Sequence, residues 1–196
     1  MHKGRLEAFS DGVLAIIITI MVLELHAPRE PGIVGLRPLV PVFLSYLLSF
    51  VFIGIYWSNH HHMLQAARVV NGATLWANLH LLFWLSLVPF ATAWMGQTFF
   101  ATLPVAAYGV ILLMAGVAYA VLARVLIRHH GKESILAKAL GGDWKGNLSL
   151  LLYACAVGLA FVRPSIACGV YVVVALLWLI PDPRIERAMR EVHRES

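Results

Sequence analysis

Charged residues are scarce in this sequence of 196 residues. Only 13% of the residues are Asp, Glu, Lys or Arg, whereas a soluble globular domain carries about a quarter. Hydrophobic residues make up 60% of the chain. This composition excludes an ordinary soluble domain and predicts an all-α membrane protein that crosses the bilayer several times. The length leaves room for one compact bundle and no second domain.

Cysteine and enzyme motifs are also missing or rare. The two cysteines, Cys155 and Cys168, both lie in apolar runs, which argues against a disulfide framework and favours a packing role. The sequence has no Gly-x-Ser-x-Gly, no phosphate-binding loop, no His-Glu-x-x-His and no paired intramembrane carboxylates. The Thr-Val-Gly-Tyr-Gly carbonyl filter is absent too. We therefore expect neither an enzyme nor a cofactor.

Six apolar segments are separable, and a membrane-spanning helix needs about 20 residues. They predict a single six-span domain over residues 1–181, followed by a charged cytoplasmic tail at 182–196, with a short amphipathic surface helix at about 134–140. The segments cover residues 6–26, 39–59, 74–95, 103–123, 147–162 and 165–181.

The distribution of basic residues predicts the orientation. If the N-terminus, loops 60–73 and 124–146 and the tail share one side, that side holds 12 of the 15 Lys and Arg. The positive-inside rule then makes both termini cytoplasmic. The net charge of +5 follows from this topology, so no nucleic-acid partner is expected. The 12 residues are Lys3, Arg5, Arg68, Arg124, Arg128, Lys132, Lys138, Lys145, Arg184, Arg187, Arg190 and Arg194.

The first segment carries polar residues at its start. Its purely apolar part, residues 12–23, is too short to cross the bilayer, so the helix must begin near Arg5. Ser10 and Asp11 are then drawn about a turn and a half into the membrane. An ionisable group at that depth is a functional hypothesis by default. The alternative is that Ser10 or Asp11 caps a shorter, tilted helix.

An aliphatic stripe continues along the same segment. Ile16, Ile20 and Leu23 recur at helical spacing, with Thr19 beside them. Such a stripe usually faces lipid or a neighbouring helix, and periodicity alone favours that interpretation. The alternative is a pore lining that acts as a hydrophobic constriction. Thr19 and Ile20 lie only about 100° apart on a helix, so the sequence leaves open which of them would face a pore axis.

A second polar group ends the second segment. It contains Trp57, His60, His61 and His62, and Asn78 lies about one turn inside the third segment. Three consecutive histidines point about 100° apart on a helix, so they cannot chelate one metal from a single face. All these residues lie on the same side of the membrane as Asp11. We expect a hydrogen-bonded network that satisfies the buried Asp11 carboxylate.

The residues of the first segment resemble a known signature. Arg5-x-x-x-Phe9-Ser10-Asp11-Gly12, running into Ile-x-Ile-Thr-Ile-x-x-Leu-Glu, resembles the motif of the transmembrane-protein-175 family, the potassium channels of lysosomes and their smaller prokaryotic relatives. The similarity extends to Trp57-x-x-His60-His61, to Asn78-Leu79 and to Leu87-Val88-Pro89-Phe90. The fourth to sixth segments match only in hydropathy.

The resemblance implies a potassium-selective channel of the inner (plasma) membrane, a homotetramer in which the first helix of each subunit lines a central pore. It implies potassium ions and the lipid bilayer as partners, and a hydrophobic constriction in place of a carbonyl filter. The implied pore and selectivity residues are Ile16, Thr19, Ile20 and Leu23. The implied first-helix motif and packing network are Arg5, Phe9, Ser10, Asp11, Trp57, His60, His61 and Asn78.

Two further functions stay open. Asp11, His60, His61 and His80 could form the relay of a proton-coupled carrier or proton leak. A non-conducting membrane scaffold is the other alternative, because small residues recur at four-residue spacing and favour close helix packing. These pairs are Gly116/Ala120, Ala154/Gly158 and Ala156/Ala160.

Overall fold

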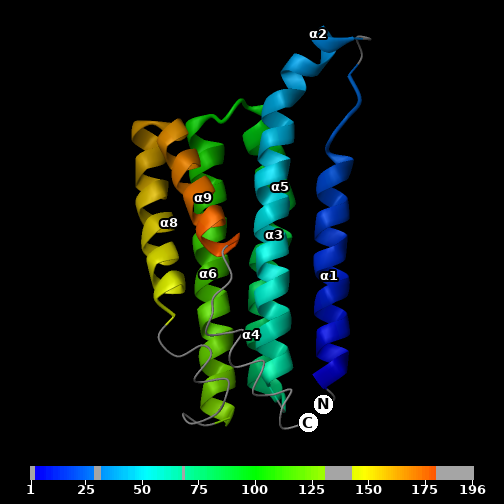
Figure 1. Cartoon of the computed structure of the whole chain (residues 1–196), viewed down its shortest axis with the longest axis vertical. Coiled ribbons are helices and arrows are strands. Elements are labelled where there is room, and N and C mark those ends of the chain that lie inside the picture. The colour runs from blue at the N-terminus through cyan, green and yellow to red at the C-terminus, as the bar shows by residue number, and fades with distance from the viewer. Residues whose placement is uncertain (1–2, 29–31, 68, 131–142, 180–196) are drawn as a thin grey trace.

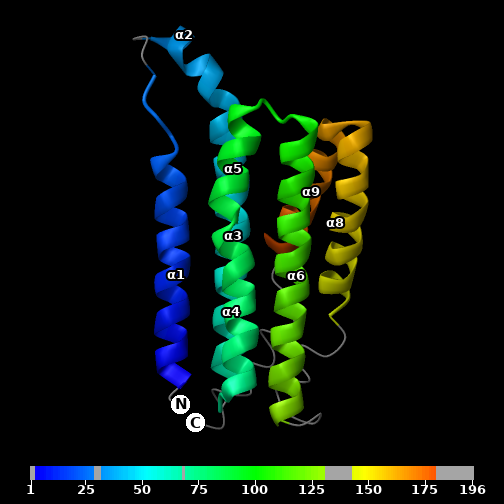
Figure 2. The same ribbon diagram turned by 180° about the vertical axis from the view of Figure 1, so that it is seen from behind.

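The computed structural model describes residues 3–28, 32–67, 69–130 and 143–179, and within these ranges it contains helices and no strand (Figures 1 and 2). The prediction of an all-α protein is confirmed. The amphipathic helix expected at 134–140 and the tail at 182–196 lie outside the described residues. The helices are α1 (Lys3–Leu23), α2 (Ile33–Leu36), η1 (Arg37–Leu39), α3 (Val40–Ala66), α4 (Gly72–Ser86), α5 (Val88–Gln97), α6 (Thr102–His130), α8 (Trp144–Val162) and α9 (Pro164–Leu179).

Five helical stretches are long and apolar enough to cross a membrane, and α9 is a sixth, shorter apolar helix of 16 residues. The chain is therefore a multi-pass membrane protein. The five stretches are Lys3–Leu23, Ile33–Ala66, Gly72–Gln97, Thr102–His130 and Trp144–Val162.

The helices run alternately up and down, with α1 at one edge of the bundle (Figures 1 and 2). α1 packs against α3, α4 and α5, whereas α6 contacts α4, α8 and α9. The core between them includes the fully buried Phe52, Tyr108 and Tyr171. Three of its polar side chains bond to one another, because the Ser49 hydroxyl lies 2.6 Å from Thr92 Oγ1 and 2.9 Å from Tyr108 Oη. A bilayer offers these groups no water, so each needs a protein partner.

Helix α3 extends beyond the apolar segment at 39–59 and ends only at Ala66. Met63 and Leu64 in the added turns are 2% and 0% exposed, so the helix still has an apolar side to bury. His60 is also buried, although hydropathy counts it as polar. Hydropathy ended the segment early because it counts His60 as a surface residue, whereas the folded helix buries it.

The third apolar segment is divided into α4 and α5 between Ser86 and Val88. Pro89 lies in the first turn of α5, where it has no N–H to give to the carbonyl of Leu85 and its ring crowds that carbonyl. The Leu87 N–H bonds instead to the Trp84 carbonyl at 3.2 Å. Both pieces contact α1, so the bend changes the surface on which the first helix rests.

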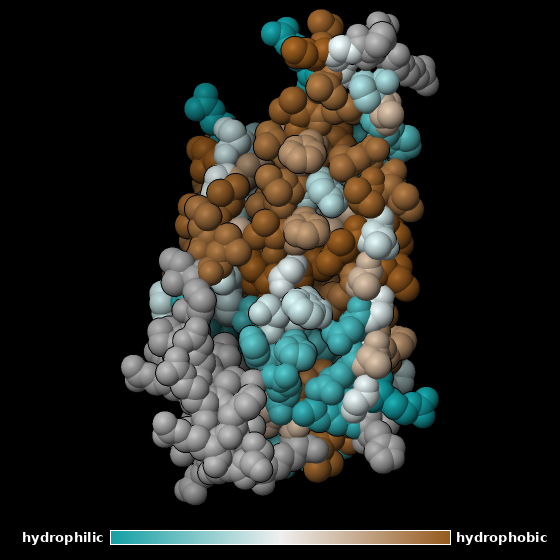
Figure 3. Space-filling view, turned by 45° about the vertical axis from the view of Figure 1, so that its right-hand side comes forward, coloured by the Kyte–Doolittle hydropathy of each residue, from teal (hydrophilic) through white to brown (hydrophobic). Residues whose placement is uncertain are grey.

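The ends of the bundle differ in charge. Five of the seven described Lys and Arg residues lie at the end where α1 begins and α6 ends. A space-filling view shows a hydrophobic band over the upper part of the molecule and a hydrophilic region at its lower end (Figure 3). The five are Lys3, Arg5, Arg124, Arg128 and Lys145, and the two at the opposite end are Arg37 and Arg163.

Candidate functional site: the first helix and its polar anchors

One side of α1 is buried against the rest of the bundle. Residues spaced three or four apart form this side, which contacts α3, α4 and α5. Four of its members are large and apolar, and the fifth, Ser10, is polar and 0% exposed. The buried residues are Leu6, Ser10, Leu14, Ile17 and Met21.

The opposite side of α1 exposes large aliphatic side chains along its upper half. Ile16 is 57% exposed, Ile20 44% and Leu23 74%. Phe9 near the helix start is exposed as well. The predicted pore residues therefore share the exposed side of an edge helix. In a membrane, such a side faces lipid, another subunit or a pore.

Thr19 and Ile20 are both exposed but have different surroundings. The Thr19 hydroxyl donates to the Ile16 carbonyl at 2.9 Å. Ile16 and Ile20 line a groove of about 690 Å³ between α1 and the α4–α5 bend, together with Phe90 and Trp94, whereas Thr19 does not. Thr19 thus lies farther from the rest of its own subunit than Ile20 does.

A buried chain of hydrogen bonds ties α1 to α3 and α4. Asn78 Nδ2 donates to Ser10 Oγ at 2.9 Å, and Ser10 Oγ donates to the Leu6 carbonyl at 2.9 Å. The amide oxygen of the same side chain, Asn78 Oδ1, lies 2.7 Å from His60 Nε2. Because an amide oxygen only accepts, His60 Nε2 must carry the proton. Ser10, His60 and Asn78 are all at most 2% exposed, so α1 is anchored by polar groups without access to water.

A second link joins α1 to α3 nearer the surface. Trp57 Nε1 donates to Asp11 Oδ1 at 3.0 Å. The indole ring also stacks on His61, with ring centroids 5.9 Å apart. Asp11 is half-buried and Trp57 is 46% exposed, so this pair forms at the border of the packed region.

We expected one hydrogen-bonded network around Asp11, but the structure contains two separate links. Asp11 bonds to Trp57, whereas His60 and Asn78 bond to each other and to Ser10. The fully buried polar group of α1 is Ser10, not Asp11 as we had expected from the sequence. Neighbouring residues lie about 100° apart on a helix, and the packing of α1 on α4 selects Ser10 for the buried side.

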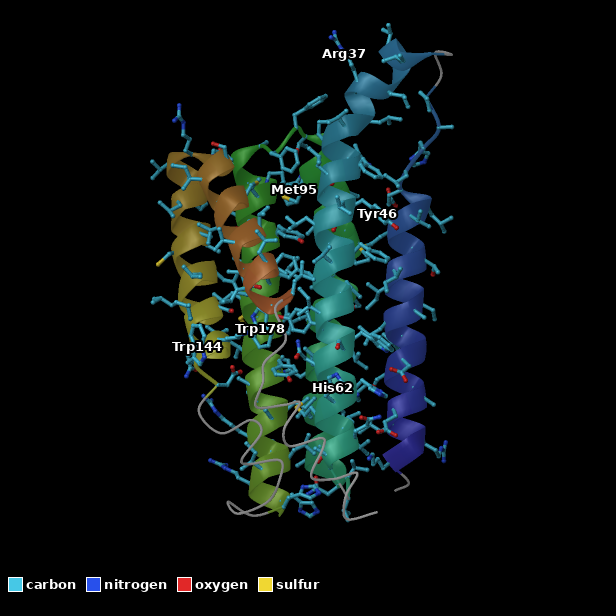
Figure 4. All side chains as sticks on the ribbon, viewed as in Figure 1. Arg37, Tyr46, His62, Met95, Trp144 and Trp178 are labelled. Atoms are coloured by element: carbon cyan, nitrogen blue, oxygen red, sulfur yellow. The ribbon has the colours of Figure 1, made fainter. Side chains whose placement is uncertain are left out.

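The remaining polar residues of the region stand apart from these links. Arg5 and Phe9 are exposed, and Arg5 makes no hydrogen bond or ion pair with the described residues. His80 Nε2 accepts a hydrogen bond from Trp84 Nε1 at 3.0 Å within α4. His62, labelled in Figure 4, has a buried Nδ1 without a hydrogen-bond partner among the residues that the structure describes.

The residues proposed for a proton relay are not connected. Among the described residues, no hydrogen bond joins any two of Asp11, His60, His61 and His80. Nor do the described residues contain a group of three or more His, Cys, Asp or Glu that could hold a metal ion. The geometry instead describes a multi-pass, all-α membrane protein whose first helix is anchored by polar groups on one side and exposes aliphatic residues on the other.

Comparison with known proteins identifies the family. Residues 5–89 match the family model described as endosomal/lysosomal potassium channel TMEM175. A protein from Chryseobacterium sp. (strain P1-3), named as a potassium channel, is 54% identical over 191 residues, covering 97% of this chain and 100% of that protein. A second potassium channel by name, from Streptomyces collinus, is 31% identical over 95% of this chain and 98% of its own length. The chain belongs to the TMEM175 family of cation channels and is not an enzyme.

Structural and eukaryotic relatives agree with this assignment. The crystal structure of a lysosomal potassium-selective channel TMEM175 homologue from Chamaesiphon minutus matches with a TM-score of 0.78 and 30% identity, covering 91% of this chain and 96% of that chain. The Homo sapiens relative is named as an endosomal/lysosomal proton channel. It is 32% identical over 87 residues, which is 36% of this chain and 17% of that protein.

Proposed function

We propose that this protein is a potassium-selective channel of the plasma membrane, a homotetramer in which α1 of each subunit lines a central pore and both termini are cytoplasmic. The observation that carries the proposal is the exposed aliphatic side of α1, on a helix whose other side is anchored by buried hydrogen bonds. The bacterial relatives that match nearly the whole chain are named as potassium channels, which supports potassium as the permeant ion.

The conduction mechanism follows from the chemistry of the exposed side chains. Around a fourfold axis, Ile16 and Leu23 would form hydrophobic rings with Ile20 at their edge, and an ion passing them must shed part of its water. Potassium is larger than sodium and holds its water less tightly, so these rings favour potassium. Selectivity is modest, because aliphatic side chains offer no fixed oxygen cage in place of the lost water.

Thr19 supplies an oxygen beside these rings. Its hydroxyl hydrogen is directed to the Ile16 carbonyl, so the lone pairs of the oxygen are turned away from the helix backbone. A cation in the pore can be attracted by those lone pairs. We therefore assign Thr19 to the ion path and Ile20 to the boundary between the pore and the groove at α5.

The polar anchors determine which side of α1 faces the pore. The Ser10–Asn78 hydrogen bond fixes the rotation of α1 about its own axis, and the Asp11–Trp57 bond fixes its position along α3. Rotation of α1 by one residue, about 100°, would replace Ile16 with a different side chain at the constriction. Asp11 in this account positions the helix and does not coordinate the ion.

The tetramer is supported by the exposed side of α1 and by the groove between α1 and α5. An edge helix that exposes Ile16 and Leu23 beside the groove at Phe90 and Trp94 presents apolar side chains and an apolar recess to a second copy. The cytoplasmic position of the termini is supported by the charge difference between the two ends of the bundle, according to the positive-inside rule.

The experiment that tests this function is ion flux into liposomes that contain the purified protein. Potassium uptake driven by its concentration gradient, without saturation and without a proton gradient, is the expected result. Ile16→Asn should change the flux, whereas Val173→Asn on α9, which alters a side chain of the same 57% exposure, should not. Equal effects of the two substitutions would contradict a pore along α1.

A proton-conducting function is the second candidate, because the eukaryotic relatives are named as proton channels and His60 is buried beside α1. The same liposomes separate the two functions when a pH-sensitive dye is enclosed. Proton flux that persists without potassium and is lost in His60→Gln, while potassium flux is absent, would favour the second candidate.

A further inference from the structure

A second cavity lies between α3, α6, α8 and α9, and none of its lining residues belongs to α1, α4 or α5. Its volume is about 330 Å³, within the range of small-molecule sites, which are mostly apolar with a few well-placed polar groups. An apolar cavity of roughly 150 Å³ already holds benzene. This space is therefore large enough for part of a lipid-sized molecule, and it is separate from the exposed side of α1.

The wall of the cavity changes from apolar to polar along the helices. At its deep end lie Phe52 of α3, Leu150 of α8 and Gly116 of α6, in the middle of the bundle. At its other end lie Arg124 and Asp143, where α6 ends and α8 begins. On α6 the lining runs from Gly116 to Ile127, which is about 16 Å along a helix.

The position of these two ends matches a lipid in one leaflet of the bilayer. The polar end lies near the end of α6 and the start of α8, toward the lower end of the bundle (Figure 1), and the apolar end lies toward the middle of the membrane. Trp178, labelled in Figure 4, extends the wall from α9 and donates to Ser149 Oγ at 2.9 Å. An amphiphile would enter with its headgroup at the charged end and its acyl chain in the interior.

The polar groups at the charged end favour an anionic headgroup. Arg124 is exposed and has no hydrogen bond or ion pair with the described residues. The nearby carboxylate of Asp143 caps α8 by accepting from the Gly146 N–H at 2.8 Å, and the N–H groups at the start of α8 offset part of its negative charge. Deeper in the cavity, the Tyr56 hydroxyl has no hydrogen-bond partner among the described residues. An arginine fork pairs well with phosphate oxygens.

We propose that this cavity binds an anionic glycerophospholipid of the leaflet at the charged end of the bundle, with its phosphate on Arg124 and one acyl chain between α3, α6 and α8. Basic pockets between membrane-spanning helices on the cytoplasmic side are a known way to hold anionic headgroups. Binding here does not depend on conduction, and it would stabilise the contact of α8 and α9 with the rest of the bundle.

The test measures the unfolding temperature of the purified full-length protein in a neutral detergent, titrated with phosphatidylglycerol or phosphatidylcholine. Phosphatidylglycerol should raise it, and phosphatidylcholine should raise it less. Arg124→Gln should remove the difference between the lipids. Arg128→Gln should preserve it, because Arg128 carries the same charge one turn further along α6, is exposed and does not line the cavity.

Two further arms distinguish the site from surface charge. Ala120→Leu fills the cavity wall on α6 and should weaken stabilisation by both lipids. Inorganic phosphate alone should produce no rise, because it lacks an acyl chain. Equal losses in Arg124→Gln and Arg128→Gln, equal stabilisation by the two lipids, or a rise with phosphate that matches phosphatidylglycerol would each overturn the proposal.

Discussion

Asn78 on α4 donates a buried hydrogen bond of 2.9 Å to the hydroxyl oxygen of Ser10 on α1. This bond joins residues 68 positions apart in the chain and fixes the rotation of the first helix. Water cannot replace it, because both side chains are 0% exposed. Its geometry therefore couples the packing of the bundle to the side of α1 that is left exposed.

Loss of the Ser10 hydroxyl should destabilise the protein. In Ser10→Ala, the Asn78 amide keeps a buried N–H without an acceptor, which costs about 1–3 kcal/mol. Unfolding in mixed SDS micelles measures this free energy. Ser86→Ala is the matched control, because the Ser86 hydroxyl donates to the Phe83 carbonyl of its own helix and is exposed. If the two variants were equally stable, the anchoring role of Ser10 would be wrong.

The Asp11 carboxylate should matter more for assembly than for selectivity. Asp11→Ala removes the acceptor of the Trp57 N–H, so α1 loses its second link to α3 and the folded tetramer should be reduced in size-exclusion chromatography. Asp11→Asn keeps an oxygen acceptor for the Trp57 N–H and should recover part of the folded tetramer. Glu7→Gln is the control, because within the described part of the chain Glu7 pairs only with Lys3 near the surface, and such pairs contribute little. A stable Asp11→Ala channel with inverted selectivity would contradict this role.

Gly96 on α5 should not tolerate a methyl group. A Cβ at Gly96 would lie 2.7 Å from the Val42 Cα, and the backbone of α3 cannot move aside as a flexible side chain can. Gly96→Ala should therefore cost about 1–3 kcal/mol through overpacking. Gly158→Ala on α8 meets nothing within 4 Å and should be neutral or up to about 1 kcal/mol more stable, since alanine favours helix. Similar melting temperatures for the two variants would exclude a tight contact between α3 and α5.

Thr19 and Ile20 should differ in access from the ion path. In a background without Cys155 and Cys168, Thr19→Cys should react rapidly with a small cationic thiol reagent and block the current. Ile20→Cys should react more slowly, because position 20 borders the groove at α5. The rate at which the reagent blocks the current measures the accessibility of each cysteine. Faster block of Ile20→Cys would assign the pore axis to Ile20 instead.

Helix content and the polar start of α1 could be predicted from the sequence, because both depend on local composition. The need for about 20 residues to cross the bilayer placed the start near Arg5, and α1 begins at Lys3. The end of α3 could not be predicted in the same way. His60 and His62 look like a solvent-exposed terminus until the buried Met63 and Leu64 are seen to continue the helix.

The sequence was enough to predict which residues form the polar anchors, but not which of them bond to one another. The sequence indicated that Asp11, Trp57, His60 and Asn78 meet at one end of the bundle. It could not separate Ser10 from Asp11, because their directions differ only by the rotation of one residue on a helix, and that rotation is set by tertiary packing on α4. The bend at Leu87 and the cavity at Arg124 likewise depend on contacts between segments distant in sequence.

The central claim, that α1 lines a pore with a constriction at Ile16, is tested most directly by the reversal potential of the purified protein in planar bilayers under asymmetric potassium and sodium. We predict that the wild-type current reverses toward the potassium equilibrium potential, that Ile16→Asn reduces this shift, and that Val173→Asn leaves it unchanged. A potassium-selective current whose reversal potential is the same in wild type and Ile16→Asn would contradict the claim.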